Sequence, residues 1–246
     1  MKLIILLSLA LTTQAFANPK TICGNTDDRI LSNESEVGRA SRTNERIGCT
    51  ATMISPTCAV SAGHCTDVLK KVSFNVPTSI DTNAQSSNAA DMYLQDKSFF
   101  KYKDNGEGDD WAVIKLKKNQ ISGLYPGDVQ GYLKVRLNQS VKKGQRVRVA
   151  GFGADKTDPI RNFAQQSHNG IIKKIGGFFA PKARLGYEVD TMGGNSGSSV
   201  VLEETNEIIG IHAQGGCGTW ASYNTGTLIS KNEELKQAIV ACLATE

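Results

Sequence analysis

Short apolar runs separated by glycine, asparagine, aspartate and proline form the main pattern of this chain. Runs of this length between turn-forming residues are typical of β-strands. We expect strands at residues 50–54, 59–62, 111–116, 146–150, 200–202 and 208–211. Many short strands with frequent turns predict an all-β fold of the sandwich or barrel type.

One helix stands out, at the C-terminus. Leu235, Ile239 and Cys242 follow at i, i+4 and i+7, which is the spacing of one face of a helix. Ser230 and Glu233 have the S-x-x-E spacing of a capping box, which would start the helix there. We therefore expect Cys242 to point into the core.

Two polar stretches interrupt the strand pattern. Residues 78–90 are rich in Ser, Asn, Thr and Ala and predict a surface loop. Residues 117–142 contain Pro126 and several glycines, so we place the boundary between two halves of the chain there. The expected units are residues 22–125 and residues 126–246, the second of which includes the terminal helix.

The N-terminus has the pattern of a secretory signal peptide. Lys2 precedes an apolar run at residues 3–11, and Ala-Phe-Ala follows at residues 15–17. This run is too short to cross a bilayer, and no later segment reaches the roughly 18 apolar residues that a span needs. We expect residues 1–17 to be removed, residues 18–21 to form a short propeptide, and the mature protein to be secreted or periplasmic.

The cysteine content agrees with export. Six cysteines follow the signal peptide: Cys23, Cys49, Cys58, Cys65, Cys217 and Cys242. An even number of cysteines in an exported protein indicates disulfides. The sequence contains no CxxC pair, the motif that would indicate a metal or redox site.

Charge does not indicate a partner. The net charge of +4 is a weak bias. Arg146 and Arg148 alternate with Val147 and Val149, as on a strand with one solvated face. No aromatic residues interleave with them to stack on bases, so we expect no nucleic-acid binding.

Three segments carry candidate chemistry, in the order histidine, aspartate, serine. They are Ser-Ala-Gly-His-Cys at residues 61–65, Asp-Asp-Trp-Ala-Val-Ile at residues 109–114, and Gly-Gly-Asn-Ser-Gly-Ser at residues 193–198. A serine hydroxyl becomes a nucleophile when an imidazole takes its proton and a buried carboxylate orients the imidazole. The order differs from that of α/β-hydrolases, and the G-x-S-x-G motif of those enzymes is absent.

The candidate catalytic residues are therefore His64, Asp110 and Ser196, with Asp109 as a rival for the carboxylate. The N–H groups of Gly194 and Ser196 could stabilise a tetrahedral oxyanion, because flanking glycines let the backbone turn. No H-E-x-x-H motif or paired-cysteine cluster is present, so we expect no metal and no cofactor.

Together these segments resemble the trypsin-like serine peptidases, and among them the bacterial glutamyl endopeptidases. The resemblance extends over nearly all of the mature chain and is most specific in Glu-Ile-Ile-Gly-Ile-His at residues 207–212. It implies two six-stranded antiparallel Greek-key barrels with a C-terminal helix. It also implies that His64 is the general base, Asp110 its orienting acid and Ser196 the nucleophile. Asp110 is favoured over Asp109 because the family's acid directly precedes the aromatic-Ala-Val run.

The resemblance also implies disulfides. It suggests a Cys49–Cys65 bridge beside the histidine. The other four cysteines allow three pairings, of which we favour Cys58 with Cys242 and Cys23 with Cys217.

Specificity for acidic residues is a further implication. The resemblance assigns Thr191 and His212 to the primary pocket, which would bind a glutamate or aspartate before the scissile bond. A mature N-terminal amine near Thr21 or Ile22 would add positive charge. If Asp190 faced the pocket instead of Thr191, cleavage after Lys or Arg would follow.

One departure concerns activation. Animal trypsin-like enzymes carry before the nucleophile an aspartate that pairs with the new N-terminal amine, and this chain has Asn195 there. The glutamyl endopeptidases share this asparagine. We expect that activation switch to be absent.

Two alternatives remain. The same fold and triad could have another primary specificity, or the chain could be a non-catalytic binding homologue. His168 lies in a polar stretch and is interpreted as a solvated loop residue. The expected partners are protein or peptide substrates, and the expected state is a monomer.

Overall fold

The computed structural model describes residues 21–43, 47–177, 180–218 and 222–246. The expected signal peptide and all but the last residue of the expected propeptide lie outside these ranges. Among the described residues, no helix is long and apolar enough to cross a membrane.

The first barrel contains six antiparallel strands. They close in the order β2-β3-β4-β7-β6-β5. Their bounds are β2 Val37–Ser41, β3 Ile47–Met53, β4 Cys58–Ser61, β5 Lys71–Ser73, β6 Met92–Asp104 and β7 Asp110–Leu116.

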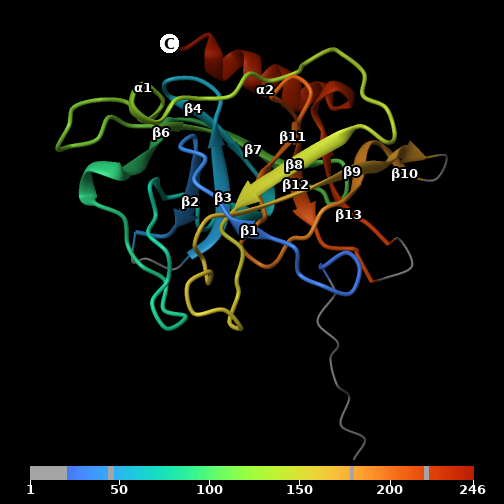
Figure 1. The fold of residues 1–246 in the computed structure, drawn as a ribbon. Coiled ribbons are helices and arrows are strands. Elements are labelled where there is room, and N and C mark those ends of the chain that lie inside the picture. Colours follow the sequence, from blue (N-terminus) through green and yellow to red (C-terminus); the bar gives the residue numbers. More distant parts are fainter. Residues whose placement is uncertain (1–20, 44–46, 178–179, 219–221) are drawn as a thin grey trace, which may run out of the picture.

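The second barrel lies beside the first and is drawn in yellow to red in Figure 1, apart from the blue strand β1 that pairs with it. Its sheet runs β1-β9-β10-β13-β12-β11-β8 and closes through the pairing of β8 with β9. The bounds are β1 Ile30–Leu31, β8 Arg146–Gly151, β9 Gln166–Gly177, β10 Ala180–Glu188, β11 Ser199–Leu202, β12 Glu207–Gln214 and β13 Asn224–Leu228. The expected fold, two six-stranded barrels with a C-terminal helix, is confirmed.

The six strands expected from apolar runs are all present, as β3, β4, β7, β8, β11 and β12. The alternation in β8 is also as predicted, with Val147 and Val149 buried and Arg146 exposed. The long strand β6 was missed because most of its residues are exposed or half-buried, so its sequence contains no continuous apolar run.

The connection between the barrels contains the short helix α1, Pro126–Gln130, at the expected boundary. However, β1 pairs with β9 of the second barrel although it belongs to the first half of the chain. The segment before β2 therefore lies against the second barrel. Residues 78–90 form a loop with one isolated bridge, between Ile80 and Asn83, and end at the 3-10 helix η2, Ala89–Asp91.

The terminal helix α2, Glu233–Leu243, lies across the top of both barrels in Figure 1. Leu235, Ile239 and Cys242 are buried as predicted. The predicted capping box is wrong: Asn232 is the N-cap, and its Oδ1 accepts the N–H of Leu235 at 2.9 Å. Ser230 cannot cap α2 because it belongs to the preceding 3-10 helix η3, Ile229–Lys231.

Three disulfides are present among the described residues: the predicted Cys49–Cys65 bridge and the two favoured pairings. Cys49–Cys65 closes a loop inside the first barrel. Cys58–Cys242 joins β4 to α2, and Cys23–Cys217 joins the N-terminal segment to the second barrel. Their Cα–Cα distances are 6.2, 6.3 and 4.8 Å, within the normal range.

Candidate active site

The pairing of β4 with β7 in the first barrel brings His64 and Asp110 together. Asp110 begins β7, and its side chain is 1% exposed. Its Oδ2 lies 2.6 Å from Nδ1 of His64, while its Oδ1 accepts the backbone N–H groups of Gly63 at 2.6 Å and His64 at 3.1 Å. One carboxylate therefore fixes both the ring and the backbone of His64. Asp109 points elsewhere and accepts from Trp111 Nε1 at 3.0 Å.

Gly63 makes this geometry possible. It starts the 3-10 helix η1, Gly63–Cys65, which presents His64. A Cβ at residue 63 would lie 1.8 Å from the carbonyl oxygen of Lys103, so no side chain fits. The small residue before the histidine thus lets η1 approach the end of β6.

Ser196 follows in a loop held by the first barrel. Its carbonyl oxygen accepts the N–H of Thr50 at 2.8 Å and lies 3.8 Å from Sγ of Cys65, the neighbour of His64. The hydroxyl of Thr50 donates to the carbonyl of Gly194 at 2.9 Å. These contacts keep the serine loop next to η1.

The loop before Ser196 is a tight turn. Asn195 N–H donates to the Met192 carbonyl at 2.9 Å, and Gly194 has a φ of 108°, as the third residue of a type II turn requires. The Gly193 carbonyl accepts from Ala154 N–H at 2.8 Å. Because C=O and N–H point in opposite directions in a trans peptide, the N–H of Gly194 points away from Ala154.

Asn195 stabilises the same turn. Its side chain is buried, and its Oδ1 accepts the N–H of Met192 at 2.9 Å. The Asn195 side chain therefore makes its hydrogen bond within the serine loop itself.

The electrostatics around His64 favour its protonated form. The hydrogen bond to Asp110 raises the pKa of His64, burial opposes this, and the charges of Asp110 and Asp104 raise it further. Asp104 is exposed at the end of β6 and pairs in register with Asp110. One oxygen of each aspartate lies within 4.8 Å of a ring nitrogen of His64. Asp104 is thus a second carboxylate beside the histidine.

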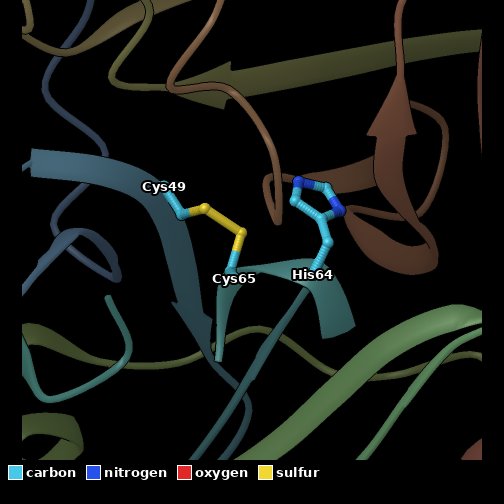
Figure 2. A group of neighbouring side chains, drawn as sticks. All are labelled: Cys49, His64 and Cys65. Carbon is cyan, nitrogen blue, oxygen red and sulfur yellow. A yellow bond between two sulfur atoms is a disulfide. The ribbon is translucent and has the colours of Figure 1, made fainter. Parts of the chain in front are cut away.

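A surface pocket of about 240 Å³ lies next to His64. It is lined by the Cys49–Cys65 bridge, Asp67 and Val68, among others. Figure 2 shows the bridge and the His64 ring side by side. The sulfurs of Cys49 and Cys65 are bonded to each other, so they offer no thiolate to a metal ion.

Asp190 does not have the environment of a pocket-base acid. It is 1% exposed, and its two oxygens accept the backbone N–H groups of Cys23 at 2.6 Å and Asp28 at 2.8 Å. Both oxygens therefore already accept a hydrogen bond from the N-terminal segment.

The interpretation of His168 as a solvated loop residue is wrong. It lies in β9, where it pairs with Val149 of β8, and its Nδ1 accepts the N–H of Asp190 at 2.8 Å. The polar stretch around it is a strand that pairs with β8 over residues 166–171 and with β1 at Gln166 and Ser167.

Thr191 is fully buried next to the N-terminal segment. Its N–H donates to the Thr21 carbonyl at 3.2 Å, and its Oγ1 accepts from Asn224 Nδ2 at 3.0 Å. Asn224 also donates to the Thr21 carbonyl at 2.7 Å and accepts from the N–H groups of Gly216 and Cys217. This asparagine joins three segments around Thr191.

His212 lies on β12 opposite the serine loop. Its N–H donates to the Ser198 carbonyl and its carbonyl accepts from Gly197 N–H, both at 2.8 Å. Its Nδ1 lies 2.5 Å from the Tyr187 hydroxyl. Burial, followed by the charge of His64 and opposed by that of Asp110, lowers the pKa of His212 to about 3. The ring is therefore neutral in the free protein near pH 7.

The sequence model of the family described as Trypsin matches residues 23–232. The chain belongs to the trypsin family of serine peptidases. This trypsin-family chain is also similar to bacterial relatives with more specific names.

A glutamyl endopeptidase of Bacillus licheniformis is 25% identical over 193 residues, covering 74% of this chain and 56% of the relative. An enzyme of Bacillus subtilis named extracellular metalloprotease is 29% identical over 77% of this chain and 57% of the relative. A glutamyl endopeptidase of Staphylococcus aureus is 32% identical over 55% of this chain and 37% of the relative. The chain thus spans between about a third and just over half of these relatives.

Solved structures agree on the trypsin-family fold. A Glu endopeptidase in complex with MPD superposes with a TM-score of 0.67 at 20% identity, covering 91% of this chain and 99% of that one. Human heparin binding protein superposes with a TM-score of 0.64 at 14% identity, covering 90% of this chain and 98% of that one. At these identities the likeness shows the fold alone.

Three residues of this trypsin-family site were not found from the sequence: Asp104, Tyr187 and Asn224. Asp104 could have been found from the hairpin, because it stands opposite Asp110 once β6 and β7 are paired. Tyr187 and Asn224 pair directly across β10 and β13, so only the strand register brings them together.

Proposed function

We propose that this chain is a secreted serine endopeptidase that cleaves peptide bonds after glutamate and, less efficiently, after aspartate. The observation that carries the proposal is the hydrogen bond between Asp110 and His64, formed beside the loop of Ser196. The three disulfides support export, because such bridges persist in oxidising compartments.

The geometry suggests how the reaction proceeds. With Nδ1–H donating to Asp110, Nε2 of His64 is a bare acceptor that can take the proton of the Ser196 hydroxyl. Ser196 Oγ then attacks the scissile carbonyl carbon, and the N–H groups of Gly194 and Ser196 stabilise the oxyanion. His64 returns the proton to the leaving amine, which gives an acyl-enzyme. Water, activated by the same imidazole, releases the acid.

The pocket residues support acidic specificity. A carboxylate that leaves water needs donors in exchange, since its burial otherwise costs several kcal/mol. Thr191 can offer a hydroxyl and His212 one N–H, while both oxygens of Asp190 already accept hydrogen bonds from the N-terminal segment. This arrangement counts against cleavage after Lys or Arg. A mature N-terminal amine near Thr21 would add positive charge.

The specificity is tested with quenched peptides that differ only in the residue before the scissile bond. We expect kcat/KM to decrease from Glu to Asp, and Gln to be slower than Glu by about 10²-fold or more, because its side chain is uncharged and its NH₂ group donates where the second carboxylate oxygen would accept. Lys and Leu peptides serve as controls. Fastest cleavage of either control would overturn the acidic specificity and leave the triad standing.

Asp104→Asn should shift the pH dependence of this activity. The charge of Asp104 contributes to the raised pKa of His64, so its removal lowers that pKa. His64 then becomes a neutral base at lower pH, and the acidic limb of kcat/KM moves to lower pH. Added salt should reduce the difference, because Asp104 is exposed.

The matched control for this shift is Asp96→Asn. Asp96 lies on the same strand, and its carboxylate accepts the N–H of Ser98 at 2.9 Å. Its replacement should leave the acidic limb in place. An identical pH profile for wild type and Asp104→Asn would contradict the electrostatic role of Asp104.

A further inference from the structure

His212 of the proposed pocket forms a buried pair with Tyr187. The Tyr187 hydroxyl lies 2.5 Å from His212 Nδ1 and 3.3 Å from the carbonyl of Thr225. Their rings meet edge to face, with centroids 6.0 Å apart. Tyr187 is fully buried and His212 is 3% exposed, so water does not compete for these contacts.

The contact can exist in two hydrogen-bonding patterns. If the hydroxyl donates to Nδ1, the proton of the neutral imidazole sits on Nε2, which is then a donor. If Nδ1–H donates to the tyrosine oxygen, the hydroxyl donates to Thr225 and Nε2 is a bare acceptor. A carboxylate accepts hydrogen bonds only, so it needs the first pattern. The amide NH₂ of a glutamine side chain could donate to the second.

The distances favour the first pattern. The 2.5 Å contact with Nδ1 is present in both patterns, but in the second pattern the single hydroxyl proton would have only the Thr225 carbonyl at 3.3 Å as its acceptor, which is a longer and weaker hydrogen bond. Burial raises the pKa of the Tyr187 phenol well above 10, so the hydroxyl keeps its proton. The Tyr187 ring is fixed by β10, which pairs with β9 and β13 on its two sides.

We propose that Tyr187 is a positioning residue that holds His212 with its proton on Nε2 and so makes the pocket select glutamate over glutamine. This inference rests on the proposed function. Tyr187 acts through His212 and touches no reacting atom itself.

The test compares Tyr187→Phe with wild type on matched Glu and Gln peptides. Phenylalanine keeps the ring but removes the donor to Nδ1, so the two protonation patterns of His212 become comparable. We expect the Glu-to-Gln ratio of kcat/KM to fall ~10- to 100-fold. The rate of fluorophosphonate labelling at Ser196 should stay unchanged, because that probe does not need the acidic pocket.

Tyr93→Phe is the matched control. Tyr93 is also buried, its hydroxyl lacks a hydrogen-bond partner among the described residues, and it lies in the other barrel. Its removal should leave the Glu-to-Gln ratio intact. A ratio within about twofold of wild type in folded Tyr187→Phe would overturn the inference. Absence of any Glu preference in wild type would instead overturn the proposed specificity, and this inference with it.

Nitrogen NMR of the otherwise unaltered Ser196→Ala protein decides the question if Tyr187→Phe does not fold. The chain has three histidines, and the His212 signals are assigned by their loss in His212→Gln. We expect His212 to carry its proton on Nε2 and to accept at Nδ1. A proton found on Nδ1 would overturn the inference.

Discussion

Replacement of Ser196 by alanine is expected to lower hydrolysis of a glutamyl peptide by about 10⁶-fold. The substitution removes the nucleophile, and what remains is the roughly 10³–10⁴-fold acceleration over water that substrate binding and an oxyanion site provide. The measurements are kcat and the covalent labelling by a fluorophosphonate, which should disappear. The loss of one oxygen atom creates little strain, so the melting temperature should change little.

Ser199→Ala is the matched control for this loss. Ser199 lies in the same segment, and its buried hydroxyl has no hydrogen-bond partner in the described part of the chain. We expect near-normal turnover and labelling for this variant. Substantial activity in Ser196→Ala would refute the mechanism. Absence of labelling in folded wild type would favour a non-catalytic binding protein.

Acid is expected to destabilise the protein through His212. The folded protein has a His212 pKa of about 3, below the ordinary value of 6.5. At a pH between these two pKa values, His212 is protonated in the unfolded chain but neutral in the folded protein. The free energy of unfolding therefore falls as the pH falls through this interval. The linkage amounts to about 2 kcal/mol between pH values of about 6.5 and 4.5.

Other groups act mainly outside this interval. The raised pKa of His64 gives stability that is fully present below about pH 6.5 and is lost as the pH rises through the folded pKa. Asp27, Asp109 and Glu207 have lowered pKa values, so their stability is lost mainly below about pH 4. The interval down to about pH 4.5 therefore reports chiefly on His212.

His212→Gln is the control for this stability profile. Glutamine does not titrate, and its amide can accept the Tyr187 hydroxyl and still offer a donor. The free energy of unfolding is measured by chemical denaturation at several pH values in a Ser196→Ala background, which prevents autolysis. It should depend less on pH in the double variant Ser196→Ala/His212→Gln than in Ser196→Ala alone. Equal slopes in the two proteins would contradict the buried, neutral state of His212.

The candidate site could be read from the sequence because its residues occur in short segments. The residues at 61–65, 109–114 and 193–198 each combine a functional side chain with small neighbours. Gly63 and Gly194 show why the small residues matter: a Cβ at Gly63 would meet the Lys103 backbone, and Gly194 needs a positive φ. Local steric demands of this kind leave a local sequence signature.

The ambiguity between Asp190 and Thr191 could not be settled in the same way. The two residues are adjacent, and their side chains meet partners from different distant segments: the N-terminal segment for Asp190 and Asn224 of β13 for Thr191. Cys23 and Asp28 supply the N–H groups that Asp190 accepts, from more than 160 positions earlier in the chain. A contact over such a separation leaves no mark in the sequence around residue 190.

The sequence by itself determined the six apolar strands, the terminal helix and the segments that carry His64, Asp110 and Ser196. Its apolar runs and glycine-flanked motifs encode these features within a few residues of one another. Only the tertiary structure decided the environment of His168, the capping of α2 by Asn232, and the pairing of Tyr187 with His212. The environment of His168 and the Tyr187–His212 pair depend on strand register and on burial by distant segments, and burial sets both the pKa of a side chain and the partners within its reach. The Asn232 cap is a local contact, but its side chain is also held by Gly108 and Asp109 from the other barrel, both at 3.0 Å.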